Sequence, residues 1–209
     1  MTRESLISLP SEDELYQGYL KRVYQHTQGY QRYSMAQLSR FASAEVCVTY
    51  GELLYPSVKK IIRQLQGTHN DIFLDLGSGL GKCALQIFMQ SEIGKVIGIE
   101  ASIPLHEQAE KIKERVKFEC PIFWENNREL SFFNDNFLKH PWQGATLVYS
   151  CSTCFTTELL VAIGNRVNEE PSVTQVLSLR PLPTIVLPLK AIFSVECSWD
   201  SVLCYHYSK

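Results

Sequence analysis

Three glycines stand within five residues in the segment 73–88, which reads FLDLGSGLGKCALQIF. They follow an apolar run and precede a helical pattern, so the backbone turns sharply between a predicted strand and a predicted helix. A turn without Cβ atoms allows a ligand to lie close to the main chain. Dinucleotides, nucleotide phosphates and S-adenosylmethionine (SAM) are three ligands that such a turn can hold. The spacing of the glycines and the acids that follow them distinguish between these ligands.

The first two ligands fit the spacing poorly. A phosphate-binding loop requires Gly-x-x-x-x-Gly-Lys followed by Ser or Thr. Leu76 stands in place of its first glycine and Cys83 in place of its hydroxyl residue, so this hypothesis fails. A dinucleotide fingerprint uses a third glycine for close packing of helix and strand. Lys82 occupies that position, so the match to a dinucleotide site is only partial.

The segment from Asp75 to Gly81, Asp-x-Gly-x-Gly-x-Gly, resembles throughout the pattern of class I SAM-dependent methyltransferases. Asp75 is expected to hold the turn and hydrogen-bond the cofactor, while Gly77 and Gly79 leave room for its methionine portion. Glu100 ends the next apolar run, about 20 residues further on, where a carboxylate can accept from both ribose hydroxyls. The structural alternatives are a merely tight turn and a solvated charge at a strand end.

Polar and aromatic residues also follow the third predicted strand, at Asp135, Asn136 and Phe137. An acid or amide side chain there can accept a hydrogen bond from the adenine amino group, and an aromatic ring can stack on the base. The sequence leaves open whether Asp135 or Asn136 makes this contact.

Composition limits the function classes. The chain has 209 residues, of which 45% are hydrophobic and 20% charged, as in an ordinary folded domain. Its net charge of −2 provides no general attraction for nucleic acid or an anionic membrane. The first residues contain no long apolar stretch, and no run approaches the roughly 20 apolar residues of a spanning helix. We therefore expect neither a secretory signal nor a membrane span.

The seven cysteines are scattered and odd in number, which favours buried free thiols in a reducing compartment. We accordingly expect a cytoplasmic location. Cys151 and Cys154 have the spacing of a redox or zinc pair, and Cys204 with His206 is the nearest candidate for a second pair. The rest of a thioredoxin-like layout is missing, so free thiols remain the favoured interpretation.

Hydrophobic periodicity predicts strands that alternate with helices. Ser11 and Glu14 resemble a capping box, and Gly67 is expected to end the helix that begins at Pro56. The other expected helices are 11–25, 30–41, 82–89, 104–116 and 156–167, and the expected strands are 72–76, 96–100, 130–133, 145–150 and 173–179. Two last strands, 191–197 and 202–207, form a hairpin. This order predicts an α/β fold whose parallel sheet is covered on both faces and carries an antiparallel edge.

Several segments resemble one particular family. Tyr50-Gly51-Glu52 is similar to the loop that covers SAM in the non-SET histone lysine methyltransferases of the disruptor-of-telomeric-silencing type. The resemblance runs from about residue 50 to the end of the sequence and is densest over 50–100. Its other residues are the glycine motif at 73–82 with Leu85 and Gln86, Asn136-Phe137-Leu138 with Trp142, and Ser198-Trp199 with Val202 and Tyr205.

The resemblance implies a class I methyltransferase fold, a Rossmann-like, seven-stranded, mostly parallel sheet with strand order 3-2-1-4-5-7-6. SAM would lie across the carboxyl ends of the strands, and Tyr50 and Glu52 would close on its methionine portion. We expect an N-terminal helical segment at 1–49, a methyltransferase domain at 50–209, and a monomer. The implied activity is protein lysine N-methylation, with a target lysine in a protein substrate.

The part of the site that would bind the methyl acceptor departs from the family. The family has an asparagine-rich stretch where this chain reads YSCSTCF at 149–155, and Leu53 replaces a usual threonine. The expected residues of the acceptor channel are Tyr149, Ser150, Phe155 and Tyr205. The basic DNA-contacting extension of the histone enzymes has no counterpart, so the histone is one of several possible substrates. Open alternatives are a small-molecule methyltransferase, a SAM-binding protein without turnover and, disfavoured by Lys82, a nicotinamide oxidoreductase.

Overall fold

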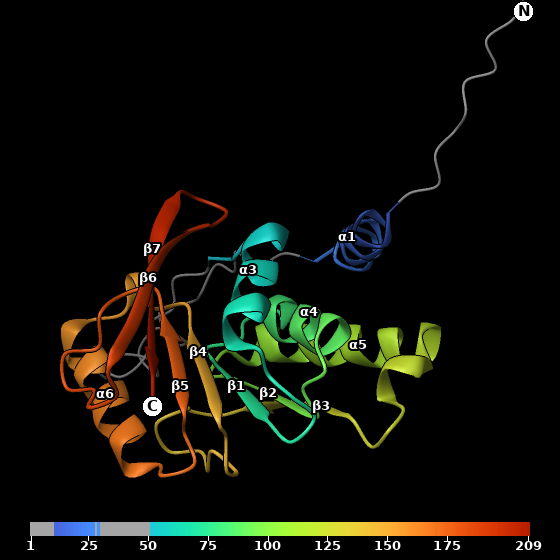
Figure 1. Cartoon of the computed structure of the whole chain (residues 1–209). Coiled ribbons are helices and arrows are strands. Elements are labelled where there is room, and N and C mark those ends of the chain that lie inside the picture. The colour runs from blue at the N-terminus through green and yellow to red at the C-terminus, as the bar shows by residue number, and fades with distance from the viewer. Residues whose placement is uncertain (1–10, 28, 30–50) are drawn as a thin grey trace, which may run out of the picture.

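The computed structural model describes residues 11–27, 29 and 51–209, so the predicted helix at 30–41 lies outside the described residues. One sheet of seven strands, in the order β3-β2-β1-β4-β5-β7-β6, forms the centre of the molecule (Figure 1). Its strands are β1 (Ile72–Leu76), β2 (Lys95–Glu100), β3 (Glu129–Asn134), β4 (Leu147–Ser150), β5 (Gln175–Ser178), β6 (Leu189–Glu196) and β7 (Ser201–Ser208). The predicted fold and strand order are confirmed. In the described part, no helix is long and apolar enough to cross a membrane.

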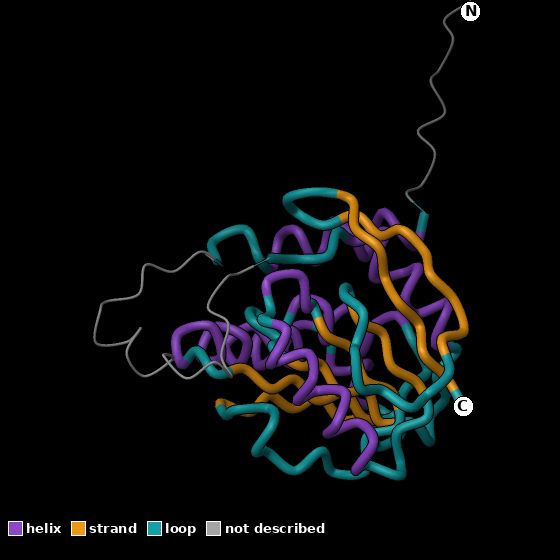
Figure 2. Tube along the Cα trace, turned by 90° about the vertical axis from the view of Figure 1, so that its left-hand side faces the viewer, coloured by secondary structure: helices purple, strands orange, loops and turns teal. Residues whose placement is uncertain are grey.

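Strands β1 to β5 run parallel, and the hairpin of β6 and β7 joins them antiparallel through β7. Every residue of β4 is buried, as expected for a central strand covered on both faces. The two long strands of the hairpin lie side by side at one edge of the molecule (Figure 2). β4 begins two residues later than predicted, since the Ala145 N–H donates to the Trp142 carbonyl in a turn and bonding to β1 starts with the Thr146 N–H, which donates to the Ile72 carbonyl at 2.9 Å.

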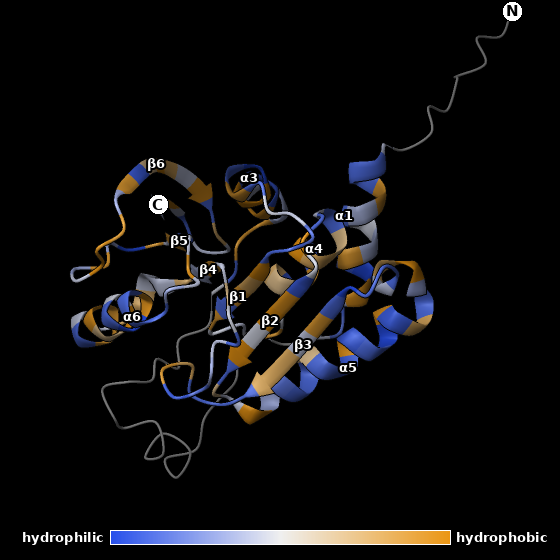
Figure 3. Cartoon of the chain, turned by 60° about the horizontal axis from the view of Figure 1, so that its bottom comes forward, coloured by the Kyte–Doolittle hydropathy of each residue, from blue (hydrophilic) through white to orange (hydrophobic). Residues whose placement is uncertain are grey.

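Helices cover both faces of the sheet (Figure 1). The first face carries α1 (Glu12–Val23), α3 (Tyr55–Leu65), α4 (Lys82–Gln90) and α5 (Ile103–Glu119), whereas α6 (Thr157–Glu169) packs on the other. The described residues also form short 3₁₀ turns at Pro121–Trp124 and Ser152–Cys154. The strands are mostly hydrophobic and the outer side of α5 is hydrophilic (Figure 3), so each layer buries its apolar side against the next.

The ends of the helices test two predictions about caps. The capping box of α1 is confirmed, because Ser11 accepts from the Glu14 N–H and Glu14 accepts from the Ser11 N–H. The cap predicted at Gly67 is wrong, since α3 ends at Leu65 and the left-handed residue is Gln66, with a φ of 49°. Gly67 serves close packing instead, because a Cβ there would lie 2.5 Å from the side chain of Ile93.

The glycine turn joins β1 to α4. Gly81 caps the start of α4 with a φ of 75°, a left-handed conformation that residues with a side chain rarely adopt. A Cβ on Gly81 would lie 2.4 Å from the ring of Phe132, which is buried in β3. Gly144 has a similar φ of 78°, but a Cβ on it would meet nothing within 4 Å. The two glycines therefore share the backbone strain and differ only in the space around them.

We predict that Gly81→Ala lowers the free energy of unfolding by about 2–4 kcal/mol, as the sum of a left-handed alanine and an overpacked contact. Gly144→Ala is the matched control, and it should lower the free energy of unfolding by only about 1–2 kcal/mol. Urea unfolding followed by circular dichroism measures both values. Equal losses in the two variants would show that the Phe132 ring moves freely to accommodate a methyl group.

Candidate functional site

The carboxyl ends of the parallel strands bring the predicted site residues to one edge of the sheet. In the register of the sheet, Asp75 on β1 stands between Gly98 on β2 and Tyr149 on β4. Glu100, the last residue of β2, stands opposite Asn134 on β3. The turn that follows β1 contains the glycines, so the acids and the glycine turn lie at the same edge. Ligands of open α/β sheets bind at this edge.

Glu100 holds the glycine turn. One oxygen of its carboxylate accepts from the Gly79 N–H at 2.8 Å, and the other accepts from the Ser102 N–H at 2.8 Å. Burial raises the pKa of Glu100, and these backbone N–H donors act in the opposite direction. A carboxylate oxygen can accept more than one hydrogen bond, so both oxygens retain the capacity to accept from a diol.

Asp75 is a buried acid without a hydrogen-bond partner. Its side chain is 1% exposed, and neither carboxylate oxygen has a partner of suitable geometry among the described residues. Burial, and next the charge of Glu100, raise the pKa of Asp75 to about 8, although the backbone N–H of Ala84 opposes the shift. Buried polar groups in native proteins are nearly always hydrogen-bonded, so an orphaned carboxyl indicates a ligand with donors.

Other buried polar atoms near Asp75 also lack partners. Nine buried side-chain nitrogen or oxygen atoms in the described part have none, and five of them lie at this edge of the sheet. These five are both oxygens of Asp75 and the hydroxyls of Ser78, Tyr149 and Ser150. Such a concentration of unsatisfied groups fits a bound polar molecule, because each would otherwise lose its hydrogen bonds to water without replacement.

The turn after β3 is ordered by its own side chains. The two oxygens of Asp135 contact the Asn136 N–H at 2.7 Å and Nδ1 of His140 at 2.9 Å, and the His140 contact lowers the pKa of Asp135. Asn136 Oδ1 accepts from the Leu138 N–H at 2.8 Å. Phe137 is mostly buried, and Trp142 Nε1 fixes its main chain by donating to its carbonyl at 2.8 Å. Which of Asp135 and Asn136 contacts adenine stays a prediction.

The segment 51–54 contacts the end of the glycine turn through a side chain. Tyr50 lies outside the described residues. Glu52 forms an ion pair with Lys82, with 2.6 Å between Oε2 and Nζ. Leu53 bridges to Cys197 in the turn of the hairpin, and the thiol of Cys151 donates to the Gly51 carbonyl at 3.8 Å. The structure thus brings Glu52 beside the glycine turn, and its contact with the methionine portion of the cofactor stays a prediction.

The four residues predicted for the acceptor channel lie at different depths. Phe155 is 9% exposed, and its ring lies 3.7 Å from where a Cβ of Gly77 would be and 6.0 Å from the ring centroid of Phe137. Tyr205 is partly exposed on β7, in register with Ser178. Tyr149 and Ser150 are buried to 1%. Phe155 is therefore brought to the glycine turn, whereas Tyr149 lies beneath the site and does not reach the surface.

The cysteines near the site are thiols without a metal cluster. No group of three or more His, Cys, Asp or Glu side chains suited to a metal occurs in the described part of the chain. Burial raises the pKa of Cys197 to about 11 and of Cys204 to about 12, and it raises the pKa of Cys151 further. Thiols with raised pKa values are poor nucleophiles, so nothing here supports a redox pair.

Sequence reasoning missed two supporting residues. Asn134 donates from Nδ2 to the carbonyls of Glu100 and Ala101, at 2.9 and 3.2 Å, and so fixes the end of β2. Arg180 donates to the carbonyl of Phe155. The signal for Asn134 was its place directly after the third predicted strand, 130–133, and one residue before Asp135, but Arg180 follows β5 and gave no sequence signal.

Solved methyltransferase structures share this fold. An RNA methyltransferase from Salinibacter ruber, in complex with S-adenosyl-L-homocysteine, aligns with a TM-score of 0.55 and 16% identity, over 73% of this chain and 90% of that one. M. capricolum TrmK, in complex with S-adenosyl-homocysteine, aligns with a TM-score of 0.52 and 8% identity, over 71% of this chain and 67% of that one. At such low identities the likeness concerns the fold alone.

Sequence comparison points to one family. A protein of Kluyveromyces lactis named "Histone-lysine N-methyltransferase, H3 lysine-79 specific" is 25% identical over 114 residues, which are 54% of this chain. The match spans only 18% of the length of that relative. The model of the family described as "Histone methylation protein DOT1" matches residues 30–191, a range that includes the glycine turn, Glu100 and the turn after β3. The chain therefore belongs to the DOT1 histone methylation protein family.

Proposed function

We propose that this chain is a SAM-dependent methyltransferase that acts on the side-chain amine of a lysine in a protein. The observation that supports it best is the group of unpartnered buried polar atoms around Asp75, beside the Glu100-bound glycine turn. The family supports the same activity, since its relative in Kluyveromyces lactis is named a histone-lysine N-methyltransferase. Two proteins of the same fold are complexes with S-adenosyl-homocysteine, the product that SAM leaves.

Each part of SAM has candidate contacts. Glu100 would accept from the two ribose hydroxyls while keeping its bonds to Gly79 and Ser102. Asp75 and Glu52 provide carboxylates for the ammonium of the methionine portion, and Phe137 provides an aromatic surface for adenine. The cofactor would supply an activated methyl group on a sulfonium. The protein residues hold it at a fixed place and orientation, which accounts for a large share of such a rate.

The acceptor amine must be neutral when it attacks. Apolar surroundings disfavour its charged form, so they lower the pKa of a lysine that enters them. Phe155, near Gly77, and Tyr205, on β7, are the aromatic side chains that we propose for these surroundings. We assign no general base. Tyr149 is 1% exposed, so we do not propose it for these surroundings, although its hydroxyl has no partner among the described residues.

Other expectations stay predictions. A monomer, a cytoplasmic location and the division into 1–49 and 50–209 belong to this group. The identity of the protein substrate is also open, because the matched region is a small part of the histone-lysine relative. A near-neutral net charge of −2 supports a protein rather than a nucleic acid as the binding partner.

We predict that Glu100→Ala weakens SAM binding by on the order of 10- to 200-fold, because two hydrogen bonds to a charged acceptor are lost. The loss should raise the KM for SAM more than it lowers kcat, since the ribose is unchanged by the reaction. Calorimetric titration and steady-state kinetics measure the two effects. Glu129→Ala is the control, because Glu129 is exposed at the opposite end of β3. Unchanged affinity in a folded Glu100→Ala protein would place the cofactor elsewhere.

We predict that SAM binding strengthens as the pH rises from 6 to 8. The pKa of Asp75 is about 8 in the free protein, so binding a cationic ligand against its carboxylate must release a proton. Each pH unit below 8 should weaken binding by up to about tenfold. The cofactor's own α-amino group titrates near 8 as well. In Asp75→Asn the contribution of this α-amino group remains, and the pH dependence of SAM binding that is due to Asp75 should disappear. The same pH dependence in parent and variant would contradict a role for Asp75.

The activity itself is tested with methyl-labelled SAM and a cell lysate. We expect label in a protein band and, after acid hydrolysis, in methyl-lysine. Glu100→Ala at a low SAM concentration is the matched control and should give little label. Label confined to small molecules would overturn the substrate class, and the absence of label despite SAM binding would overturn the activity.

A further inference from the structure

Lys82 carries a charge of the wrong sign for its position. It is the first residue of α4, and the N-terminus of a helix favours anions and disfavours cations. Its ammonium lies 2.6 Å from Oε2 of Glu52, and the two side chains are 32% and 20% exposed. The carboxylate of Glu52 offsets the unfavourable charge and is itself well placed at a helix N-terminus. The pair thus joins segment 51–54 to the end of the glycine turn.

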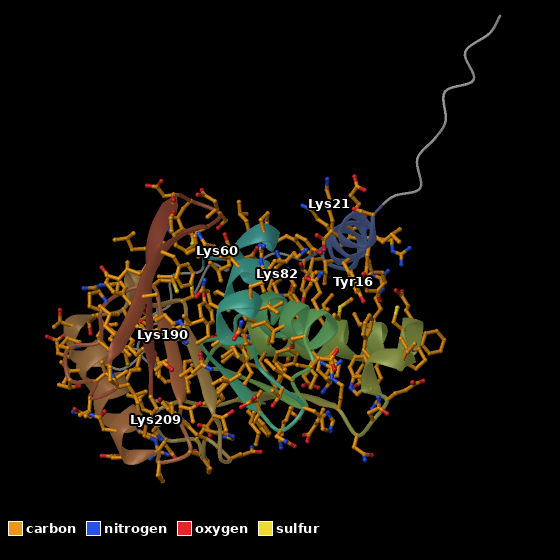
Figure 4. All side chains as sticks on the ribbon, in the orientation of Figure 1. Tyr16, Lys21, Lys60, Lys82, Lys190 and Lys209 are labelled. Atoms are coloured by element: carbon orange, nitrogen blue, oxygen red, sulfur yellow. The ribbon has the colours of Figure 1, made fainter. Side chains whose placement is uncertain are left out.

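Tyr24 is the third member of this contact. It is the C-cap residue of α1 and is buried to 9%. Its hydroxyl donates to the carbonyl of Leu80 in the glycine turn at 3.3 Å, and the Lys82 ammonium lies 5.2 Å from the centroid of its ring. Figure 4 labels Lys82 where α3 and α4 meet. The end of α1, the glycine turn and segment 51–54 therefore meet at one lysine.

Segment 51–54 is bound to the hairpin by its backbone. The Ser198 N–H donates to the Glu52 carbonyl at 2.8 Å, and the Leu54 N–H donates to the Glu196 carbonyl at 2.9 Å. Gly51 lies against the ring of Trp199, where a Cβ would be 2.2 Å from a ring carbon. Backbone contacts attach the segment to the hairpin, whereas a side-chain ion pair attaches it to the glycine turn.

We propose that Lys82 is a positioning residue that holds Glu52 and segment 51–54 against the glycine turn, and so encloses the methionine portion of the cofactor. This inference rests on the proposed function. Lys82 acts through Glu52, with Tyr24 behind it, and not by contact with the substrate. A half-buried ion pair is suited to this task, because it is strong enough to favour the closed position and weak enough to exchange when the cofactor leaves.

Lys82→Met, which keeps most of the stem and removes the charge, should weaken SAM binding by about tenfold, within the range of measured pair couplings. Most of the change should appear in koff, since enclosure slows escape more than it speeds encounter. The value of kcat at saturating SAM should change by less than about twofold. Lys82→Arg, which keeps the charge, should retain most of the affinity. Stopped-flow displacement and calorimetry measure these values.

Lys113→Met is the matched control. Lys113 pairs with Glu110 on α5 at 2.7 Å and is also mostly buried, but it lies away from the glycine turn. Removing its charge should leave SAM affinity unchanged. The melting temperature of Lys82→Met without cofactor should stay within a few degrees of the parent, which separates positioning from a loss of fold.

A double-mutant cycle tests whether Lys82 acts through Glu52. If it does, Glu52→Gln combined with Lys82→Met should bind SAM no more weakly than Glu52→Gln alone. Additive losses would show that Lys82 contacts the cofactor itself and would overturn the proposal. Unchanged koff in Lys82→Met would also overturn it. If the parent protein binds neither SAM nor S-adenosyl-homocysteine, the proposed function fails before this inference is tested.

Discussion

The hydrogen bond between the Gly79 N–H and the carboxylate of Glu100 connects the two strands whose ends form the site. The carbonyl of Ile99 accepts from Gly77 and Ser78 at 2.9 and 3.1 Å, so the glycine turn folds back over the end of β2. This return requires left-handed backbone and close approach to Phe132, which only glycine permits. The glycine turn also determines where α4 begins, and therefore where Lys82 lies. The geometry of the site therefore depends on one partly buried acid, Glu100, whose carboxylate accepts from main-chain N–H groups.

That arrangement leaves buried polar atoms without hydrogen-bond partners at the same edge of the sheet. The prediction that Asp75 holds the glycine turn is wrong, because the Gly79 N–H donates to Glu100 and neither oxygen of Asp75 has a hydrogen-bond partner among the described residues. The hydroxyls of Tyr149 and Ser150 are similarly left over at the end of β4. A folded protein tolerates this cost where a ligand restores the missing hydrogen bonds. The same few atoms thus lower the stability of the free protein and favour the binding of a ligand that supplies the missing hydrogen bonds.

Much of the fold could be predicted, because strand–helix alternation is a strong pattern and because the glycine motif resembles a known family. The depth of side chains could not. Every residue of β4 is buried, so its pattern does not reveal that Tyr149 points into the core rather than toward an acceptor. The left-handed residue at the end of α3 is Gln66 and not Gly67. Gly67 instead packs against Ile93, where a side chain would not fit. Pairs such as Glu52 with Lys82, 30 residues apart, follow from the three-dimensional structure and leave no local signal.

The attachment of segment 51–54 to the hairpin has a consequence for the order of folding. Glu52 and Ser198 are separated by 146 residues, so this contact closes one of the longest loops in the described chain. Long-range contacts form late, because the entropy of closing the loop must be offset by structure already in place. On the ribosome, the glycine turn and Glu100 emerge well before the hairpin does. A growing chain therefore forms the glycine turn and the Glu100 contact early. It would be unable to retain a cofactor until Ser198 and its neighbours had been made.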